Sequence, residues 1–391
     1  MAYQKTVREY GLKVGFFSYR DIKDRVDYDV KLAVVDTLRA FCLSEFTSVA
    51  QYAAHHSVSR LVVPLIQKYI GLMESGKQNV THEFYLKYFH ILLATGHIKF
   101  NTFDLVMLDE AGDLNPVTLE IFKLIPAKRK IMVGDPFQNI YSFNGTINGF
   151  EAMKDKAVSM PMTQSFRVAD HIALRVENFC QIHLDPKMTF RGVHYEDKTI
   201  TTSAFISRTN GALISEMIDL NKTKTPYNLI RPAKQIFQIP LLLLGLKPRG
   251  FISNAQYKHL QDDVNAYYRD RSIAADGTSL LGYILQQHPD DVNLKSAVNL
   301  ILKHGPLAVM DCHKTAASHE GTKHPYTLTT AHSSKGLEFD HVTIADDFNT
   351  QIGGLVDIKP EDRAPEDQEL FRLYYVACTR AKKSIANAQH L

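Results

Sequence analysis

The residues with the clearest chemical potential are two adjacent carboxylates, Asp109 and Glu110, which directly follow a short apolar run at 105–108. The run is rich in residues that favour β-structure, and we expect it to form a buried parallel strand. An aspartate at the end of such a strand can hold a hydrated Mg²⁺, and a neighbouring glutamate can orient or deprotonate an attacking water molecule. The alternative is that the two carboxylates only solvate a turn.

A second polar cluster follows the next apolar run, at 130–133, where Asp135 and Gln138 come after the predicted strand. Between the two runs, Asn115 and Pro116 are typical of the N-cap and first residue of a helix. A strand, a helix and a strand place both polar clusters at the carboxyl edge of one parallel sheet, which is where ligands bind. Gln138 can sense a terminal phosphate there.

The stretches LDEAGD and VGDPFQNIYSFNG resemble motifs II and III of the UvrD-like superfamily 1 DNA helicases, in particular the F-box DNA helicase type. Three further stretches resemble later motifs of this family in the expected order: QSFR at 164–167, TTAHSSKGLEFD at 329–340 and LYYVACTRAKK at 373–383. The resemblance implies an α/β fold with two RecA-like parallel-sheet motor domains, the first incomplete, and small, mainly helical insertions.

The same resemblance implies a division of the chain. It makes residues 1–100 a helical insertion of the 1B type with its lead-in, and 101–160 the C-terminal part of the first motor domain, 1A. It makes 161–245 together with 324–391 the second motor domain, 2A. Residues 246–323 then form a small insertion similar to subdomain 2B.

In the first motor domain the resemblance implies three roles around ATP and Mg²⁺. Asp109 corresponds to the magnesium ligand, and Glu110 to the catalytic residue that activates water. Gln138 corresponds to a residue that reads the γ-phosphate. Gly112 departs from the family, which has glutamine there, and loss of that amide weakens the coupling between the nucleotide and DNA sites.

In the second motor domain Arg167 and Arg380 correspond to residues that reach the γ-phosphate. Arg380 is the expected arginine finger, which neutralises the charge that develops as the phosphoryl group leaves. Glu338 corresponds to the carboxylate that binds the ribose of ATP, and Gly336 lets the main chain approach closely. Closure of the cleft between the two domains on ATP, and its opening after hydrolysis, drives the motor.

Four residues correspond to DNA contacts in the family. An aromatic ring at Phe143 stacks on a base of the single strand, and Tyr141 lines the same channel. Thr330 and His332 correspond to residues that contact the DNA backbone. For Phe143 the alternative is burial as a core aromatic at strand spacing. The family implies 3′-to-5′ translocation on single-stranded or partly duplex DNA.

The sequence contains no GxxxxGK[ST], the phosphate loop whose backbone N–H groups and lysine hold the β- and γ-phosphates. We expect a second polypeptide to supply that Walker A segment, and we expect this chain alone not to hydrolyse ATP. A wrongly assigned start or a decaying fragment is the other explanation for the missing loop. The sheet of the first motor domain should then expose an edge that would otherwise pair. The alternative function is a catalytically inactive DNA-binding remnant of a helicase.

Composition is that of a globular chain: 391 residues, 45% apolar, with a formal net charge of +3. The four cysteines form no CxxC pair, which predicts free thiols in a reducing compartment. The N-terminus resembles no signal peptide, and the longest apolar run, 236–246, contains a proline and is too short for a bilayer. We therefore expect an intracellular protein that is not secreted, in the cytoplasm, nucleoid or nucleus, acting in DNA repair, replication or recombination.

Three further groups of polar residues are expected to be solvated. The histidines and one cysteine within 304–324 match no zinc-finger spacing. Lys382 and Lys383 should lie on an exposed face. The acidic, proline-bearing loop at 357–369 should be surrounded by water.

Overall fold

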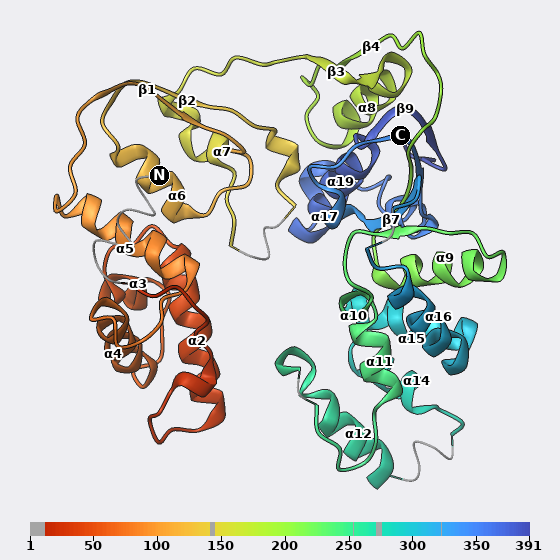
Figure 1. Ribbon diagram of the computed structural model, residues 1–391, viewed down its shortest axis with the longest axis horizontal. Helices are drawn as coiled ribbons and strands as arrows, with labels where there is room; N and C mark the ends of the chain where they lie inside the picture. Colours follow the sequence, from red (N-terminus) through yellow and green to blue (C-terminus); the bar gives the residue numbers. More distant parts are fainter. Residues whose placement is uncertain (1–11, 141–144, 253, 271–275, 322) are drawn as a thin grey trace. The chain divides into compact units, whose positions relative to one another are not determined.

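The computed structural model describes residues 12–140, 145–252, 254–270, 276–321 and 323–391. The chain divides into two units, Met1–Met160 and Pro161–Leu391 (Figure 1). Tyr141 and Phe143, both predicted to contact DNA, lie outside the described residues. No helix within the described ranges is long and apolar enough to cross a bilayer.

The first unit begins with a group of helices that share one apolar core. The helices are η1 (Tyr19–Asp21), α2 (Tyr28–Leu43), α3 (Val49–His55), α4 (Val62–Glu74) and α5 (His82–Ala94). Thr81 caps α5, since its side chain accepts a hydrogen bond from the N–H of Phe84 at 3.2 Å. Lys87 of α5 is buried and donates to the carbonyls of Ser44 and Phe46, which joins α5 to the end of α2.

A small α/β part follows, and it confirms the predicted order of strand, helix and strand. It consists of β1 (Phe103–Leu108), α6 (Pro116–Leu124), β2 (Ala127–Met132), η2 (Pro136–Gln138), α7 (Gly149–Met153) and η4 (Lys154–Lys156). β1 and β2 are parallel. Asn115 is the N-cap of α6 and Pro116 its first residue, as the sequence predicts.

The prediction that the first strand is buried is wrong. Phe103, Leu105 and Met107 of β1 are 45%, 42% and 62% exposed, and Ile131 of β2 lies beside them on the same face. Side chains alternate between the two faces of a strand, and only the other face packs against the apolar side of α6. We call the four exposed residues the uncovered face of β1 and β2.

The second unit is built on a five-stranded parallel sheet, which confirms the α/β class. The strand order is β6 (Asn228–Leu229), β7 (Tyr326–Thr330), β5 (Ser203–Ser207), β8 (Phe339–Ile344) and β9 (Ala381–Ala386). The helices that connect these strands include α9 (Asn210–Lys222), α17 (Ala331–Ser334), α18 (Asp346–Gly353), η6 (Pro360–Asp362) and α19 (Pro365–Cys378). The parallel arrangement brings the carboxyl ends of β5 and β7 to one edge.

Two smaller groups of elements complete the second unit. A pair of parallel strands, β3 (Gln164–Ala169) and β4 (Arg191–Val193), packs with α8 (Asp170–His183), and β3 also contacts β9. The second group is helical: α10 (Ala233–Ile236), α11 (Gln238–Leu244), η5 (Ala255–Tyr257), α12 (Leu260–Arg269), α14 (Leu280–Gln287), α15 (Val292–His304) and α16 (Pro306–Ser318). Helices α15 and α16 contact α9, and their apolar residues belong to one core with it (Figure 1). All four cysteines are buried as thiols.

Candidate functional site

The two adjacent carboxylates lie directly after β1, at the carboxyl edge of the two-stranded sheet. Both Asp109 and Glu110 are exposed, and Asp109 Oδ1 accepts a hydrogen bond from the N–H of Glu110 at 2.9 Å. Glu110 has φ = 55°, in the left-handed region that non-glycine residues seldom adopt. Such strain is often found at functional sites, where surrounding contacts hold it in place. Here the N–H of Ala111 donates to the carbonyl of Val133 at 2.9 Å.

Gly112 packs directly against the loop that follows β2. A Cβ atom at this position would lie 2.1 Å from the carbonyl oxygen of Asp135, which belongs to the backbone. No side chain fits here unless that backbone moves. The glycine that stands in place of the family glutamine is therefore required by packing in this chain.

Gln138 is held at the same edge by Asp135. Its Nε2 donates to Asp135 Oδ2 at 2.9 Å, while Asp135 Oδ1 accepts from the N–H of Phe137 at 2.9 Å. The N–H of Gly149 also donates to the carbonyl of Ala111 at 2.9 Å. The structure thus brings the predicted residues Asp109, Glu110 and Gln138 to one edge of the first unit.

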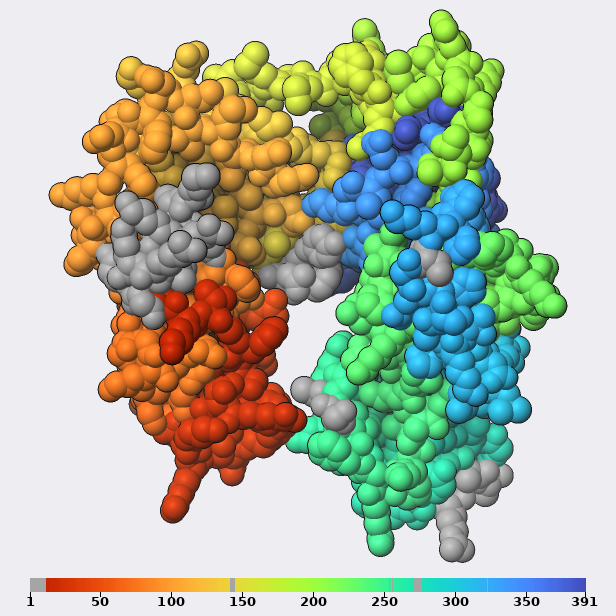
Figure 2. All heavy atoms as spheres, in the orientation of Figure 1, coloured from red at the N-terminus to blue at the C-terminus, as the bar shows by residue number. Residues whose placement is uncertain are grey.

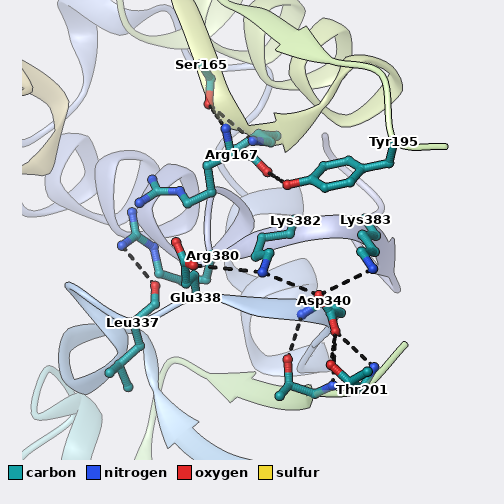
Figure 3. Close-up of polar contacts among 12 residues, drawn as sticks. Ser165, Arg167, Tyr195, Thr201, Leu337, Glu338, Asp340, Arg380, Lys382 and Lys383 are labelled. Carbon is teal, nitrogen blue, oxygen red and sulfur yellow. Dashed lines mark hydrogen bonds and ion pairs between the residues drawn. The ribbon is translucent and has the colours of Figure 1, made fainter. Parts of the chain in front are cut away.

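In the second unit Arg167 lies on β3, which contacts β9 close to Arg380. Its backbone is fixed, because its N–H donates to Ser165 Oγ at 3.2 Å and its carbonyl accepts from the hydroxyl of Tyr195 at 2.7 Å. Its Nε is buried and has no hydrogen-bond partner within the described residues. Figure 3 shows the side chains of Arg167 and Arg380 directed to the same side.

Arg380 is only 1% exposed, so the predicted arginine finger is not open to solvent in this structure. Its Nε donates to the carbonyl of Val376 at 2.9 Å, and Nη1 donates to the carbonyl of Leu337 at 3.3 Å (Figure 3). Nη2 donates to Thr379 Oγ1 at 3.2 Å. The guanidinium therefore fastens the end of α19 to the segment before β8.

The prediction that Lys382 and Lys383 are solvated is wrong. Their side chains are 28% and 12% exposed, because β9 pairs with β8 and places both ammonium groups beside Asp340, at 3.5 and 3.9 Å (Figure 3). Lys382 also lies 3.8 Å from the predicted ribose ligand Glu338, and Lys383 lies 3.3 Å from Asp197. These five charged residues link β9 to β8 and to Asp197.

Asp340 is the centre of this charge cluster. Burial alone would raise the pKa of its carboxyl group, but hydrogen bonds from the hydroxyl and N–H of Thr201, from the N–H of Thr202 and the charge of Lys383 outweigh burial. The pKa of Asp340 consequently lies well below its usual range. Asp340 is therefore ionised at neutral pH, and its contacts fix the strand that follows Glu338.

Gly336 lies between α17 and β8 with φ = 82°, and a Cβ atom there would meet no protein atom within 4 Å. The position requires glycine for its left-handed backbone rather than for lack of space. That another molecule approaches the main chain here stays a prediction. Glu338, two residues on, is half exposed.

The predicted DNA contacts Thr330 and His332 lie at the carboxyl end of β7. Thr330 donates from Oγ1 to Ser333 Oγ at 3.2 Å. Both Thr330 and Ser333 line a narrow pocket with Asn210 and Arg231. Asn210 begins α9, and its Oδ1 is buried without a hydrogen-bond partner among the described residues.

Asn210 is a candidate that the sequence interpretation missed. Its signal was present, because it follows the strand at 203–207 closely, as Asp109 follows β1. Asp347 holds this turn: it accepts hydrogen bonds from the N–H groups of Arg208 and Thr209 at 3.1 and 2.8 Å. Burial raises the pKa of Asp347.

Phe166 is a second candidate whose side chain the sequence interpretation did not consider. Its ring is 84% exposed on β3, next to Arg167. An exposed aromatic beside a cation presents a face on which a base can stack.

The histidines and cysteine within 304–324 do not converge. His304 Nε2 lies 2.8 Å from Ser215 Oγ, Cys312 is buried in the helical core, and His319 stacks on Tyr227 with 4.5 Å between ring centroids. Among the residues that the structure describes, no group of three or more His, Cys, Asp or Glu side chains could hold a metal ion.

The prediction that the loop at 357–369 is merely solvated is wrong for its centre. Arg363 is buried, and its guanidinium donates to the carbonyl of His183 at 3.2 Å and lies 3.0 Å from His183 Nδ1. It also lies over the ring of Phe371, 3.8 Å from its centroid. The contacts of Arg363 with His183, 180 positions away in the sequence, thus fix this loop to α8.

The His183–Arg363 contact should make the stability of the second unit depend on pH. Burial, together with the charges of Arg363 and His390, lowers the pKa of His183 to about 4 from an ordinary value of 6.5. The unfolded chain therefore binds this proton first as the pH falls. The contribution of neutral His183 to the free energy of unfolding is complete above pH 6.5. It is lost as the pH falls from 6.5 to 4, by up to about 3 kcal/mol. The melting temperature should therefore fall more steeply with decreasing pH for the wild type than for His183→Gln. Glutamine keeps a hydrogen-bond acceptor for Arg363.

The control is His194→Gln, which changes an exposed histidine of the same unit. It should melt like the wild type at every pH. Equal slopes for the wild type and His183→Gln would contradict the assignment of this pH dependence to His183.

Comparison with known proteins gives two family matches. Residues 67–157 match the UvrD/REP helicase N-terminal domain, and residues 307–387 match the UvrD-like helicase C-terminal domain. The first match includes β1, α6 and β2, and the second includes β7, β8 and β9. These matches confirm the resemblance that the motifs indicate.

Two curated relatives are similar over most of this chain. F-box DNA helicase 1 of Gallus gallus is 26% identical over 345 residues, which cover 81% of this chain and 31% of the relative. F-box DNA helicase protein 1 of Schizosaccharomyces pombe (strain 972 / ATCC 24843) is 25% identical over 312 residues, which cover 73% of this chain and 34% of the relative. The chain spans about a third of the length of these relatives.

Proposed function

Since this chain carries the N- and C-terminal domains of the UvrD-like DNA helicases, we propose that it forms motor elements of an ATP-dependent DNA helicase. The observation that carries the proposal is the gathering of Asp109, Glu110 and Gln138 at one sheet edge of the first unit. Movement along single-stranded DNA with 3′-to-5′ polarity is part of the proposal.

The residues at the edge of β1 and β2 fit a magnesium nucleotide. Asp109 is an exposed carboxylate at a strand end, and one of its oxygens accepts only a local N–H, so the carboxylate can hold Mg²⁺. The metal would neutralise charge on the phosphates. Glu110 takes the proton of the attacking water molecule. Gln138 exchanges its hydrogen bond with Asp135 for one to the γ-phosphate.

Arg167 and Arg380 supply positive charge from the second unit. The buried Nε of Arg167, which has no hydrogen-bond partner among the described residues, fits a phosphate oxygen as acceptor. Arg380 keeps its Nε on Val376 and uses Nη1, whose bond to Leu337 is long at 3.3 Å. Glu338 binds the ribose and Gly336 leaves room for the nucleotide.

The DNA strand is proposed to lie across the carboxyl end of β7. Thr330 and His332 contact its backbone, as the family resemblance implies. Asn210 adds a side-chain oxygen that has no hydrogen-bond partner among the described residues and can accept a hydrogen bond. Phe143 is proposed to stack on a base and Tyr141 to line the same channel.

We propose that a phosphate loop reaches this site from outside the 391 residues, either from a second polypeptide or from elsewhere in a longer one. The uncovered face of β1 and β2 gives such a segment an apolar surface to pack on. Mixing this chain with a fragment that carries GxxxxGK[ST] should give DNA-stimulated ATP hydrolysis above the sum of the separate rates.

The matched control for this mixing experiment is the same fragment with its loop lysine replaced by alanine. It should bring no increase. A rate with the intact fragment that does not exceed the two separate rates would contradict the proposal that the loop is supplied in this way.

One observation favours the alternative of an inactive DNA-binding remnant: the guanidinium of Arg380 is enclosed and bonded to backbone carbonyls. An arginine in that position can have a purely structural role. Substitution of Glu110, considered below, separates the two functions.

A further inference from the structure

The loop of residues 247–251, between α11 and η5, presents cationic and aromatic side chains to solvent. Lys247 and Arg249 are exposed, and the ring of Phe251 is 85% exposed. From 247 to 261 the sequence contains three cationic residues, Lys247, Arg249 and Lys258, and no carboxylate. Neither Lys247 nor Arg249 forms an ion pair within the described part of the chain.

This loop is held in one conformation by α12. The N–H of Arg249 donates to Asn265 Oδ1 at 3.0 Å, and Gln261 Nε2 donates to the carbonyl of Lys247 at 3.2 Å. The N–H of Gly250 closes the turn on the same carbonyl at 3.1 Å. Because the backbone is already ordered, the side chains bind with less loss of conformational entropy than those of a free loop.

The surface continues along α12. Gln261, Asn265 and Tyr268 are spaced at i, i+4 and i+7, so they share one helix face. Tyr268 is 52% exposed and Arg269 follows it. The carboxylates of this stretch lie at 262, 263 and 270, and the one at 263 is already paired with His288 at 2.7 Å.

The chemistry of this surface favours a nucleic acid over a protein partner. Cations bind phosphates, and isolated exposed rings stack on unpaired bases. A protein interface would instead show a contiguous apolar patch, and lysine is depleted from the cores of such interfaces. Figure 2 shows the chain around residue 250, where the colour turns from green to teal, at the surface of the molecule.

We propose that the loop 247–251 and the adjoining face of α12 form a second contact site for single-stranded DNA. Lys247 and Arg249 bind two phosphates and Phe251 stacks on an unpaired base. The proposal rests on the proposed function, because it concerns the DNA on which the motor would act. It adds a contact remote in sequence from Thr330 and His332.

The test measures binding of the whole chain to a fluorescein-labelled oligothymidylate by fluorescence anisotropy over a range of salt concentrations. Lys247→Ala with Arg249→Ala should reduce the slope of log affinity against log salt by about 1.4, since each phosphate contact on a single strand contributes about 0.7. Phe251→Ala should weaken binding by about 5- to 150-fold without a change in slope, and less on blunt duplex DNA.

The matched control is Lys198→Ala with Lys295→Ala, which removes two exposed charges elsewhere in the same unit. If the loop variants bind like this control, while Thr330→Ala with His332→Ala lowers affinity, the loop site is wrong and the proposed function stands. If the wild-type chain does not bind the oligonucleotide at all, both are wrong. An equal loss on duplex and single strands for Phe251→Ala would overturn the stacking role.

Discussion

Replacing Glu110 with glutamine is expected to lower DNA-stimulated ATP hydrolysis by about 100-fold or more, since general-base catalysis contributes about 10²- to 10⁴-fold. Glutamine keeps the size of the side chain but cannot accept the proton of the attacking water. Glu110 is exposed at the end of β1 and contributes no buried contact, so stability and DNA affinity should not change. Phosphate release is measured in the presence of the phosphate-loop segment, alongside DNA binding.

The control for this substitution is Glu151→Gln, an exposed glutamate of the same unit that lies on α7. It should hydrolyse ATP at the wild-type rate. If Glu110→Gln instead leaves the biological effect of the chain intact, hydrolysis is not its function and the DNA-binding remnant is the better description. The result therefore decides between the two proposed functions.

Replacing Arg380 with alanine is expected to have two effects of different size. Loss of an arginine finger lowers hydrolysis by about 10³-fold or more. The same change removes the guanidinium donors to the carbonyls of Val376 and Leu337, and among the described residues only that of Val376 keeps a second donor, the hydroxyl of Thr379. The loss should lower the free energy of unfolding by about 1–3 kcal/mol. Phosphate release and thermal melting are measured on the same samples.

Arg380→Lys separates these two effects. Lysine keeps the charge but lacks the planar fork that bonds several acceptors at once. If Arg380 is catalytic, kcat for hydrolysis falls by a much larger factor than the change in the free energy of unfolding can explain. The control is Arg60→Ala, which removes an exposed arginine of the first unit and should change neither hydrolysis nor stability. If the loss of activity in both Arg380 variants only parallels their loss of stability, Arg380 is structural only.

The elements around Asp109, Glu110 and Gln138 could be predicted because the information is local. An apolar run, an N-cap with proline and a second apolar run lie within 30 residues or so, and each predicts its element by short-range rules. The parallel pairing of β1 with β2 then brings the polar ends together. What the pattern could not show was the burial of β1, because burial depends on what covers each face.

The interpretation failed where distant segments meet. Lys383 looks like a surface lysine in its own sequence context, and only the pairing of β8 with β9 places it beside Asp340. Arg363 sits in an acidic, proline-bearing stretch, yet its partner His183 belongs to another helix. The burial of Arg380 could not be predicted for the same reason, because its acceptor Leu337 belongs to a different sequence motif.

The close contact between Gly112 and Asp135 has a mechanical consequence. Because the two backbones touch with no intervening side chain, the peptide after Glu110 cannot shift without pressing on the residue that holds Gln138. Gln138, which we propose to sense the γ-phosphate, and Glu110, which we propose to activate water, would then move together. Direct backbone contact at Gly112, with no side chain between, would then link the two loops.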